Sequence, residues 1–187
     1  MPTSVQGILY HQPVLHPRGN TLLPLHQLGD RYPDLYERHL RNYDARPDVL
    51  RSPVEPLHCT WADVIFLSPL HPAPLFDAIG RSYREPWTLD AARLDPDRAV
   101  IRLMRHGKDG HYPDPADEHD YVPFTTATLR AVNRVTQAAI DRLSRLQRGD
   151  PALPWVDVPH ILYRGSIPLD WFTRTDAAAA SASPIVA

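Results

Sequence analysis

Proline constrains this chain more than any other residue type. Its 187 residues include 21 prolines and only 8 glycines. Proline fixes φ near −65° and has no backbone N–H, so it interrupts both helices and sheets. Because proline is abundant and glycine scarce, the connecting loops should be long, stiff and ordered. We therefore expect short helices and strands joined by rigid segments.

The composition excludes several classes of protein. With 20 basic and 22 acidic side chains the formal net charge is −2, which gives no general attraction to nucleic acid or to a membrane surface. No apolar run approaches the roughly 20 residues that span a bilayer, and the amino terminus lacks a secretion-signal pattern. Cys59 is the single cysteine, which excludes an internal disulfide and a cysteine-rich zinc site. We expect a cytoplasmic protein with a small-molecule or nucleotide substrate.

Apolar runs predict strands in the first two thirds of the chain. One strand is expected from Gly7 to His11 and another from Trp61 to Ser68. The apolar stretch Val64–Leu67 is continuous, so this strand should be buried on both faces. The unit from Trp87 to Leu103 predicts a strand, a tight turn at its Asp-Pro-Asp sequence and a second strand.

The segment from Val158 to Phe172 combines three features. A short buried strand carries His160, a turn follows at Gly165-Ser166, and Pro168 begins a helical turn that ends in aromatic residues. This segment is expected to close the fold.

Three helical regions are expected. Leu22 to Tyr43 should be helical in two pieces, broken at Pro33, and Pro74 to Ile79 should form a short helix. The strongest helix should be capped by Thr125 or Thr126 and end at Gly149 and Pro151. It carries an apolar stripe that should pack on the core, made of Leu129, Val132, Val135, Ala139, Ile140, Leu143 and Leu146.

Short strands with few helices between them indicate an α+β fold. We expect a mainly antiparallel sheet packed with a few helices. A chain of this length can bury the core of a single domain, predicted here over residues 1–174. The Ala- and Ser-rich tail, residues 175–187, is expected to be disordered.

Arg105-His106-Gly107 follows a predicted strand. It resembles the Arg-His-Gly signature of histidine phosphatases, in which the histidine accepts a phosphoryl group and the arginine holds its oxygens. In those enzymes the motif lies near the amino terminus of a long α/β domain, whereas only about 80 residues follow it here. A strand end with a glycine turn is the favoured interpretation.

Histidines and carboxylates concentrate in the polar stretch that follows, which is expected to be a surface loop. Imidazole and carboxylate groups are ligands of zinc, nickel or iron, but a solvated acidic loop explains the same residues. A second possible ligand cluster is formed by His58, Cys59 and His71, but packing and turn capping explain the same residues. The loop residues concerned are His106, Asp109, His111, Asp114, Asp117, Glu118, His119 and Asp120.

The order of the segments resembles the ADP-ribosyltransferase-like superfamily, including its branches that act on DNA bases and on RNA 2′-phosphates. Ile8–His11 is similar to the strand that presents a polar residue to the nicotinamide ribose, and Asp63–Ser68 to the second motif strand, with Ser68 at its hydroxyl-bearing end. Leu89–Leu94 looks like an "Asp-Ala-x-x-Leu" strand of that superfamily. Ile161–Phe172 resembles its closing segment.

The resemblance implies a site and a departure from the family. His11, Ser68 and His160 should converge in a cleft and carry the chemistry, with Tyr10 and Arg164 binding the cofactor. NAD, another nucleotide-like molecule or a small metabolite would be the substrate. His160 occupies the position of the family's catalytic glutamate. A histidine can hydrogen-bond a ribose hydroxyl, but it cannot offset an oxocarbenium charge as a carboxylate does.

Three hypotheses about function follow. The first is a divergent ADP-ribosyltransferase-like enzyme with His160 as general base or hydroxyl anchor. The second is a non-catalytic ligand-binding module on the same scaffold. The third is an unrelated metal-dependent α+β enzyme that uses the loop histidines, for which a metal cofactor is required.

Overall fold

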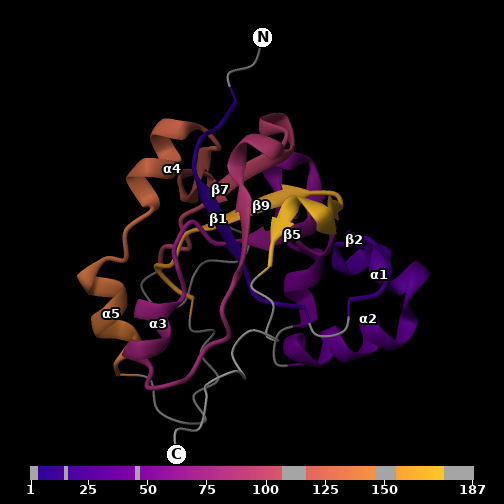
Figure 1. The fold of residues 1–187 in the computed structure, drawn as a ribbon, viewed down its shortest axis with the longest axis horizontal. Helices are drawn as coiled ribbons and strands as arrows, with labels where there is room; N and C mark the ends of the chain where they lie inside the picture. Colours follow the sequence, from indigo (N-terminus) through magenta and orange to yellow (C-terminus); the bar gives the residue numbers. More distant parts are fainter. Residues whose placement is uncertain (1–3, 15–16, 45–46, 107–116, 146–154, 175–187) are drawn as a thin grey trace, which may run out of the picture.

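The computed structural model has an α+β fold with antiparallel sheets, as the sequence predicts. It describes residues 4–14, 17–44, 47–106, 117–145 and 155–174. The predicted tail and most of the predicted histidine-rich loop lie outside these ranges. Figure 1 shows the sheets in the middle of the molecule, with α1 and α2 on one side and α3, α4 and α5 on the other.

The larger sheet has four strands in the order β5-β9-β7-β8, and every neighbouring pair is antiparallel. Its central strand β9 comes from the closing segment and pairs with strands that lie far earlier in the chain. The strands are β5 (Val64–Leu67), β7 (Ala99–Arg102), β8 (Tyr121–Pro123) and β9 (His160–Arg164).

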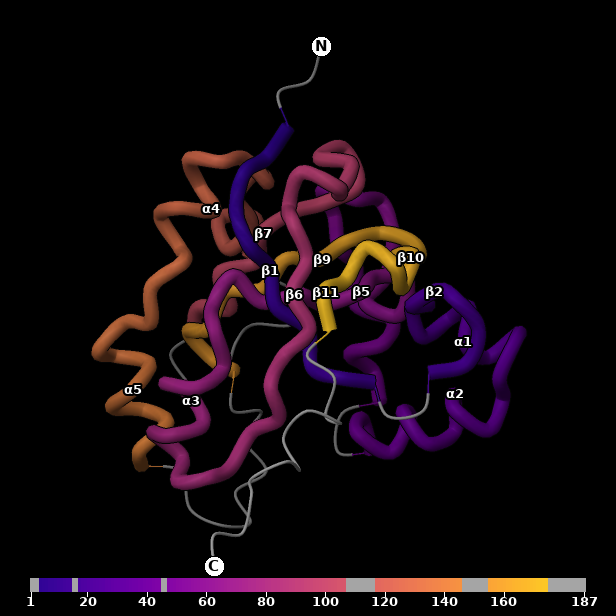
Figure 2. Tube along the Cα trace, viewed as in Figure 1, coloured from indigo at the N-terminus to yellow at the C-terminus, as the bar shows by residue number. Residues whose placement is uncertain are grey.

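A second sheet has three strands in the order β1-β6-β11, and Figure 2 shows β6 between its two partners. Its strands are β1 (Ile8–His11), β6 (Trp87–Asp90) and β11 (Phe172–Thr173). Two small antiparallel pairs complete the sheets. They are formed by β2 (Thr21–Leu22) with β10 (Ile167–Pro168), and by β3 (Pro53–Val54) with β4 (Cys59–Thr60).

The main core lies between the two larger sheets. It joins Leu9 and Leu89 of the three-stranded sheet to Leu67, Ile101 and Ile161 of the four-stranded sheet. A second cluster packs on the opposite face of the four-stranded sheet, against the alternate side chains of the same strands. Burial on both faces explains why β5 is apolar throughout and why β7 and β9 are apolar except at their ends.

The unit from Trp87 to Leu103 contains the two strands that its sequence predicts, but they do not pair with each other. β6 belongs to the three-stranded sheet and β7 to the four-stranded sheet. Two 3₁₀ turns separate them, Ala91–Arg93 and Pro96–Arg98, each begun by an aspartate that accepts a hydrogen bond from the backbone. The chain therefore crosses from one sheet to the other here.

Proline also shapes the helices. Helix α1 (Leu25–Arg31) ends before α2 (Pro33–Leu40), whose first residue is Pro33, so the predicted break is confirmed. The predicted short helix appears as α3 (Ala73–Ala78).

The prediction of one long helix after Thr125 is wrong, because the structure has two. Thr125 caps α4 (Thr126–Val132) as expected, but Thr136 then caps a second helix, α5 (Gln137–Leu143). Leu129 of α4 packs in the main core, whereas Leu143 of α5 packs in a third cluster with α3. One straight helix could not pack the same apolar stripe against both clusters, so the chain bends between α4 and α5. No helix in the described ranges is long and apolar enough to cross a membrane.

Replacing Leu162 tests the central position of β9. Its side chain is 0 % exposed between two paired strands, so Leu162→Ala should lower the free energy of unfolding by about 2–5 kcal/mol. Urea denaturation followed by circular dichroism measures the change. The matched control is Ile8→Ala in β1, because Ile8 is 52 % exposed and its loss should change stability by less than about 0.5 kcal/mol. Equal effects of the two substitutions would contradict the assigned fold.

Candidate functional site

Three of the predicted site residues lie in a row across neighbouring strands. Tyr10 of β1 and Ser68, which directly follows β5, form an isolated antiparallel bridge with two backbone hydrogen bonds of 2.8 Å. The register of β5 and β9 pairs Leu67 with Ile161, so Ser68 comes next to His160. His160 in turn pairs with Arg102 of β7. Residues from opposite ends of the sequence are thus brought together by backbone pairing.

His160 has a defined tautomer. Its Nδ1–H donates to the carbonyl oxygen of Val158 at 2.8 Å. A carbonyl oxygen only accepts, so in the neutral ring the proton is on Nδ1 and Nε2 carries a lone pair. His160 can therefore accept a hydrogen bond from a ligand hydroxyl through Nε2.

His160 is also held in its neutral form. Burial, with a smaller contribution from the charge of Arg102, lowers its pKa from 6.5 to about 4. Arg102 is itself buried, where its Nε donates to the carboxylate of Asp120 at 3.1 Å and its guanidinium lies 5.1 Å from the Trp61 ring. At neutral pH His160 is an uncharged acceptor.

The Ser68 hydroxyl is engaged in the turn after β5. It donates to the carbonyl oxygen of Leu70 at 2.9 Å and accepts from the backbone N–H of Leu70 at 3.0 Å. These bonds close a turn that leads the chain to His71. Ser68 therefore fixes the turn after β5 in addition to placing a hydroxyl beside the site.

His11 points away from this row. Tyr10 packs against His71, whereas the His11 ring lies 6.4 Å from Trp87 and 5.9 Å from Phe172. Successive side chains of a strand point to opposite faces, which explains the separation. Burial lowers the pKa of His11 to about 4. The structure thus brings Tyr10, Ser68 and His160 together and places His11 on the other face of β1.

Arg164, predicted to bind the cofactor, lies at the opposite end of β9 from His160, roughly 13 Å away along the strand. Its guanidinium donates to the carbonyl oxygen of Leu57 at 3.1 Å. Nearby, burial raises the pKa of the Cys59 thiol to about 11, with the charge of Asp63 acting in the same direction. Cys59 is therefore a protonated thiol at neutral pH rather than a nucleophile.

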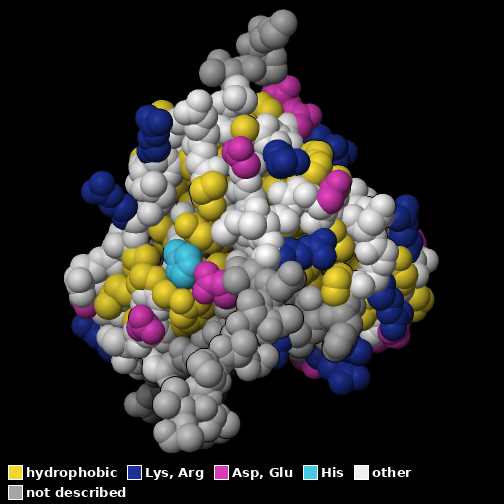
Figure 3. All heavy atoms as spheres, in the orientation of Figure 1, with side chains coloured by type: hydrophobic (Ala, Val, Ile, Leu, Met, Phe, Trp, Pro, Cys, Tyr) yellow, Lys and Arg dark blue, Asp and Glu magenta, His cyan; other side chains and the backbone are white. Residues whose placement is uncertain are grey.

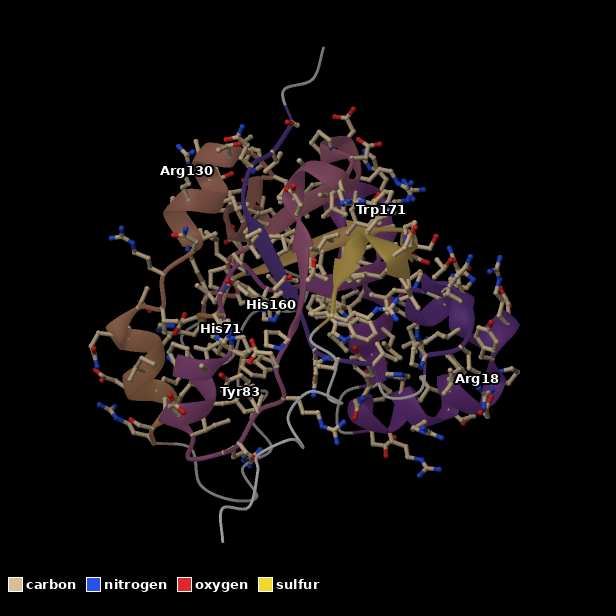
Figure 4. The ribbon with its side chains drawn as sticks, viewed as in Figure 1. Arg18, His71, Tyr83, Arg130, His160 and Trp171 are labelled. Atoms are coloured by element: carbon tan, nitrogen blue, oxygen red, sulfur yellow. The ribbon has the colours of Figure 1, made fainter. Side chains whose placement is uncertain are left out.

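Half-buried aromatic side chains surround the row, and sequence patterns did not predict this. Successive rings are in contact from Tyr10 through His71 to Tyr83, then to Phe76, Trp155 and His160, with centroid separations of 5.1 to 6.4 Å. The Phe66 ring also contacts His160, with ring centroids 6.4 Å apart. Figure 4 labels three of these side chains in one region beside α3. We call this set the aromatic surface: Tyr10, Phe66, His71, Phe76, Tyr83, Trp155 and His160.

His71 occupies the edge of the aromatic surface beside a carboxylate. The backbone N–H of Ala73 donates to its Nδ1 at 3.2 Å, which leaves the proton of the neutral ring on Nε2. That nitrogen lies 3.6 Å from Oε1 of Glu85. Figure 3 shows a histidine side chain on this face of the molecule, next to an acidic side chain and among hydrophobic side chains.

His106 forms a separate polar cluster after β7. Its Nδ1 lies 2.9 Å from both carboxylate oxygens of Asp157, which also accepts from Nε of Arg142 at 3.2 Å. The backbone N–H of Asp157 donates to the carbonyl oxygen of Met104, and both residues have positive φ values, 63° and 58°. Asp157 therefore binds the end of β7 to the segment that leads into β9.

The hypothesis of a metal-dependent enzyme requires a set of metal ligands, and the described parts of the chain contain none. No group of three or more histidine, cysteine, aspartate or glutamate side chains in these parts could hold a metal ion. His119 pairs with its neighbour Glu118 at 3.7 Å, whereas His106 pairs with Asp157. Asp120 pairs with Arg102, and Asp117 caps the turn that contains His119. The remaining predicted loop ligands, Asp109, His111 and Asp114, lie outside the described residues.

Comparisons with protein families, curated proteins and solved structures found no match for this chain. The resemblance to ADP-ribosyltransferase-like enzymes thus stays a prediction that depends on the residues described above.

The lowered pKa values of His11 and His160 predict a loss of stability in acid. Both histidines bind a proton near pH 6.5 in the unfolded chain but only near pH 4 in the folded one. The free energy of unfolding should therefore be constant above about pH 7 and should fall between pH 6.5 and 4. The expected slope is about 1.4 kcal/mol per pH unit for each histidine.

Urea denaturation at a series of pH values measures this slope. His160→Phe should reduce the slope by about 1.4 kcal/mol per pH unit, the contribution of one histidine, while His119→Gln, at an exposed side chain, should leave it unchanged. A slope that is the same in wild type and His160→Phe would show that His160 is not held neutral by the fold.

Proposed function

We propose that this chain is a divergent ADP-ribosyltransferase-like protein that binds NAD or a related nucleotide where Tyr10, Ser68 and His160 adjoin. The observation that carries the proposal is the Tyr10–Ser68 bridge. It joins the two segments that resemble the first and second motif strands of that superfamily. His160, at the position of the family's glutamate, follows in the same row.

The chemistry of His160 favours binding a hydroxyl over stabilising a cation. Its Nε2 lone pair can accept a hydrogen bond from a ribose hydroxyl, as the family's carboxylate would. A neutral imidazole supplies no negative charge to an oxocarbenium ion, and with a pKa of about 4 it is a weak general base at neutral pH. Binding is therefore the proposed function, and any cleavage of the glycosidic bond should be slow.

The aromatic surface supports the same proposal. Bases stack on half-exposed aromatic rings with a gain of about 1–3 kcal/mol each, whatever the base. Tyr83 and Trp155 are both half-buried members of this surface, and Trp155 lies 6.4 Å from His160. A base stacked on Trp155 would lie next to His160.

Thermal unfolding with and without NAD tests the proposal. A ligand present at 100 times its Kd stabilises a protein by about 2.7 kcal/mol, which corresponds to a rise in Tm of roughly 5–10 °C for a chain of this size. His160→Phe keeps a ring but removes the Nε2 acceptor, so it should weaken binding by about tenfold, equivalent to ~1.4 kcal/mol. His119→Gln is the control.

Mass spectrometry of the same mixtures, with and without a chelator, detects released nicotinamide. Slow release of nicotinamide that is lost in His160→Phe and unaffected by the chelator would show that the protein cleaves NAD as well as binding it. Release that the chelator abolishes would favour a metal-dependent enzyme. Unchanged Tm values with NAD, ATP and AMP would contradict the proposal.

A further inference from the structure

Three rings of the aromatic surface meet almost at right angles. The ring planes of Tyr10 and His71 are inclined by 81° with centroids 5.1 Å apart, and those of His71 and Tyr83 by 88° with centroids 5.8 Å apart. Each ring is partly exposed, in contrast to Trp61 and Trp87, which are 6 % and 7 % exposed in the core. The rings therefore form an angular aromatic surface that solvent can reach.

A carboxylate lies beside these three rings. Oε1 of Glu85 is 3.6 Å from Nε2 of His71, and the Glu85 side chain is 55 % exposed. The ring faces carry the negative part of the aromatic quadrupole, and the carboxylate adds a full negative charge. Both features attract a positively charged ligand.

We propose that Tyr10, His71, Tyr83 and Glu85 form a binding site for an organic cation, either a quaternary ammonium group or an N-alkylated aromatic ring. Perpendicular rings surround such a cation on several sides, and its diffuse charge is easily removed from water. The carboxylate of Glu85 selects the cation over a neutral molecule of the same shape. This site does not depend on the proposed nucleotide function, because its ligand needs neither ribose nor phosphate.

Two small probes that differ in charge test the inference. Cationic 1-methylnicotinamide and neutral nicotinamide have nearly the same ring, and calorimetric or NMR titration of the full chain gives both affinities. The cation should bind at least tenfold more tightly. Tetramethylammonium should compete with it, because the site recognises a diffuse positive charge rather than a pyridine ring.

Two variants assign the binding to these residues. Glu85→Gln keeps the shape of an exposed side chain and should reduce the preference for the cation several-fold, and Tyr83→Leu should weaken binding of the cation by a similar factor. Arg84→Gln removes the neighbouring positive charge and should not weaken binding, and Glu118→Gln is a control at another exposed carboxylate. Melting curves of each variant verify that it is folded.

Equal affinity for the two probes, no binding of either, or an unchanged preference in Glu85→Gln would each overturn the inference. These results are separate from the test of nucleotide binding. A chain that binds NAD but shows no preference for the small cation would keep the nucleotide function and lose the cation site.

Discussion

The candidate site depends on a single backbone bridge. Two hydrogen bonds of 2.8 Å connect Tyr10 with Ser68, and they join the edge of the three-stranded sheet to the end of β5. Without this bridge, Tyr10 and His160 would belong to sheets related only by their packed core. Because the register of β5 and β9 places Ser68 next to His160, one geometric constraint brings residues of three strands close together.

The surrounding fold determines the chemistry of His160. β9 is an inner strand of the larger sheet, so the histidine at its start is partly buried, and desolvation keeps it uncharged at neutral pH. The Val158 carbonyl then selects the tautomer, and contacts with Phe66 and Trp155 hold the ring. A position that carries a charged carboxylate in the family that the sequence resembles here carries an uncharged acceptor, so the proposed function emphasises binding.

Much of the fold was predictable, and the exceptions have physical causes. A continuous apolar run identified β5, a short buried strand before the Gly165-Ser166 turn was expected where β9 lies, and Pro33 located the break between α1 and α2. The single helix predicted after Thr125 was wrong because helical spacing continues across the bend, while the side chains on either side pack in different clusters. The spacing of apolar residues indicates that a side chain is buried, but it does not indicate which part of the protein the side chain packs against.

Local sequence determined which segments are strands and helices, and the family resemblance singled out His11, Ser68 and His160 as catalytic residues and Tyr10 as a cofactor-binding residue. The tertiary structure alone decided that Tyr10, rather than His11, adjoins Ser68 and His160, that His11 faces Trp87 and Phe172, and that scattered aromatic residues form one surface. Strand type depends on side chains within a few residues of one another. Strand pairing depends on the burial and hydrogen bonding of segments far apart in the chain, which no local pattern encodes.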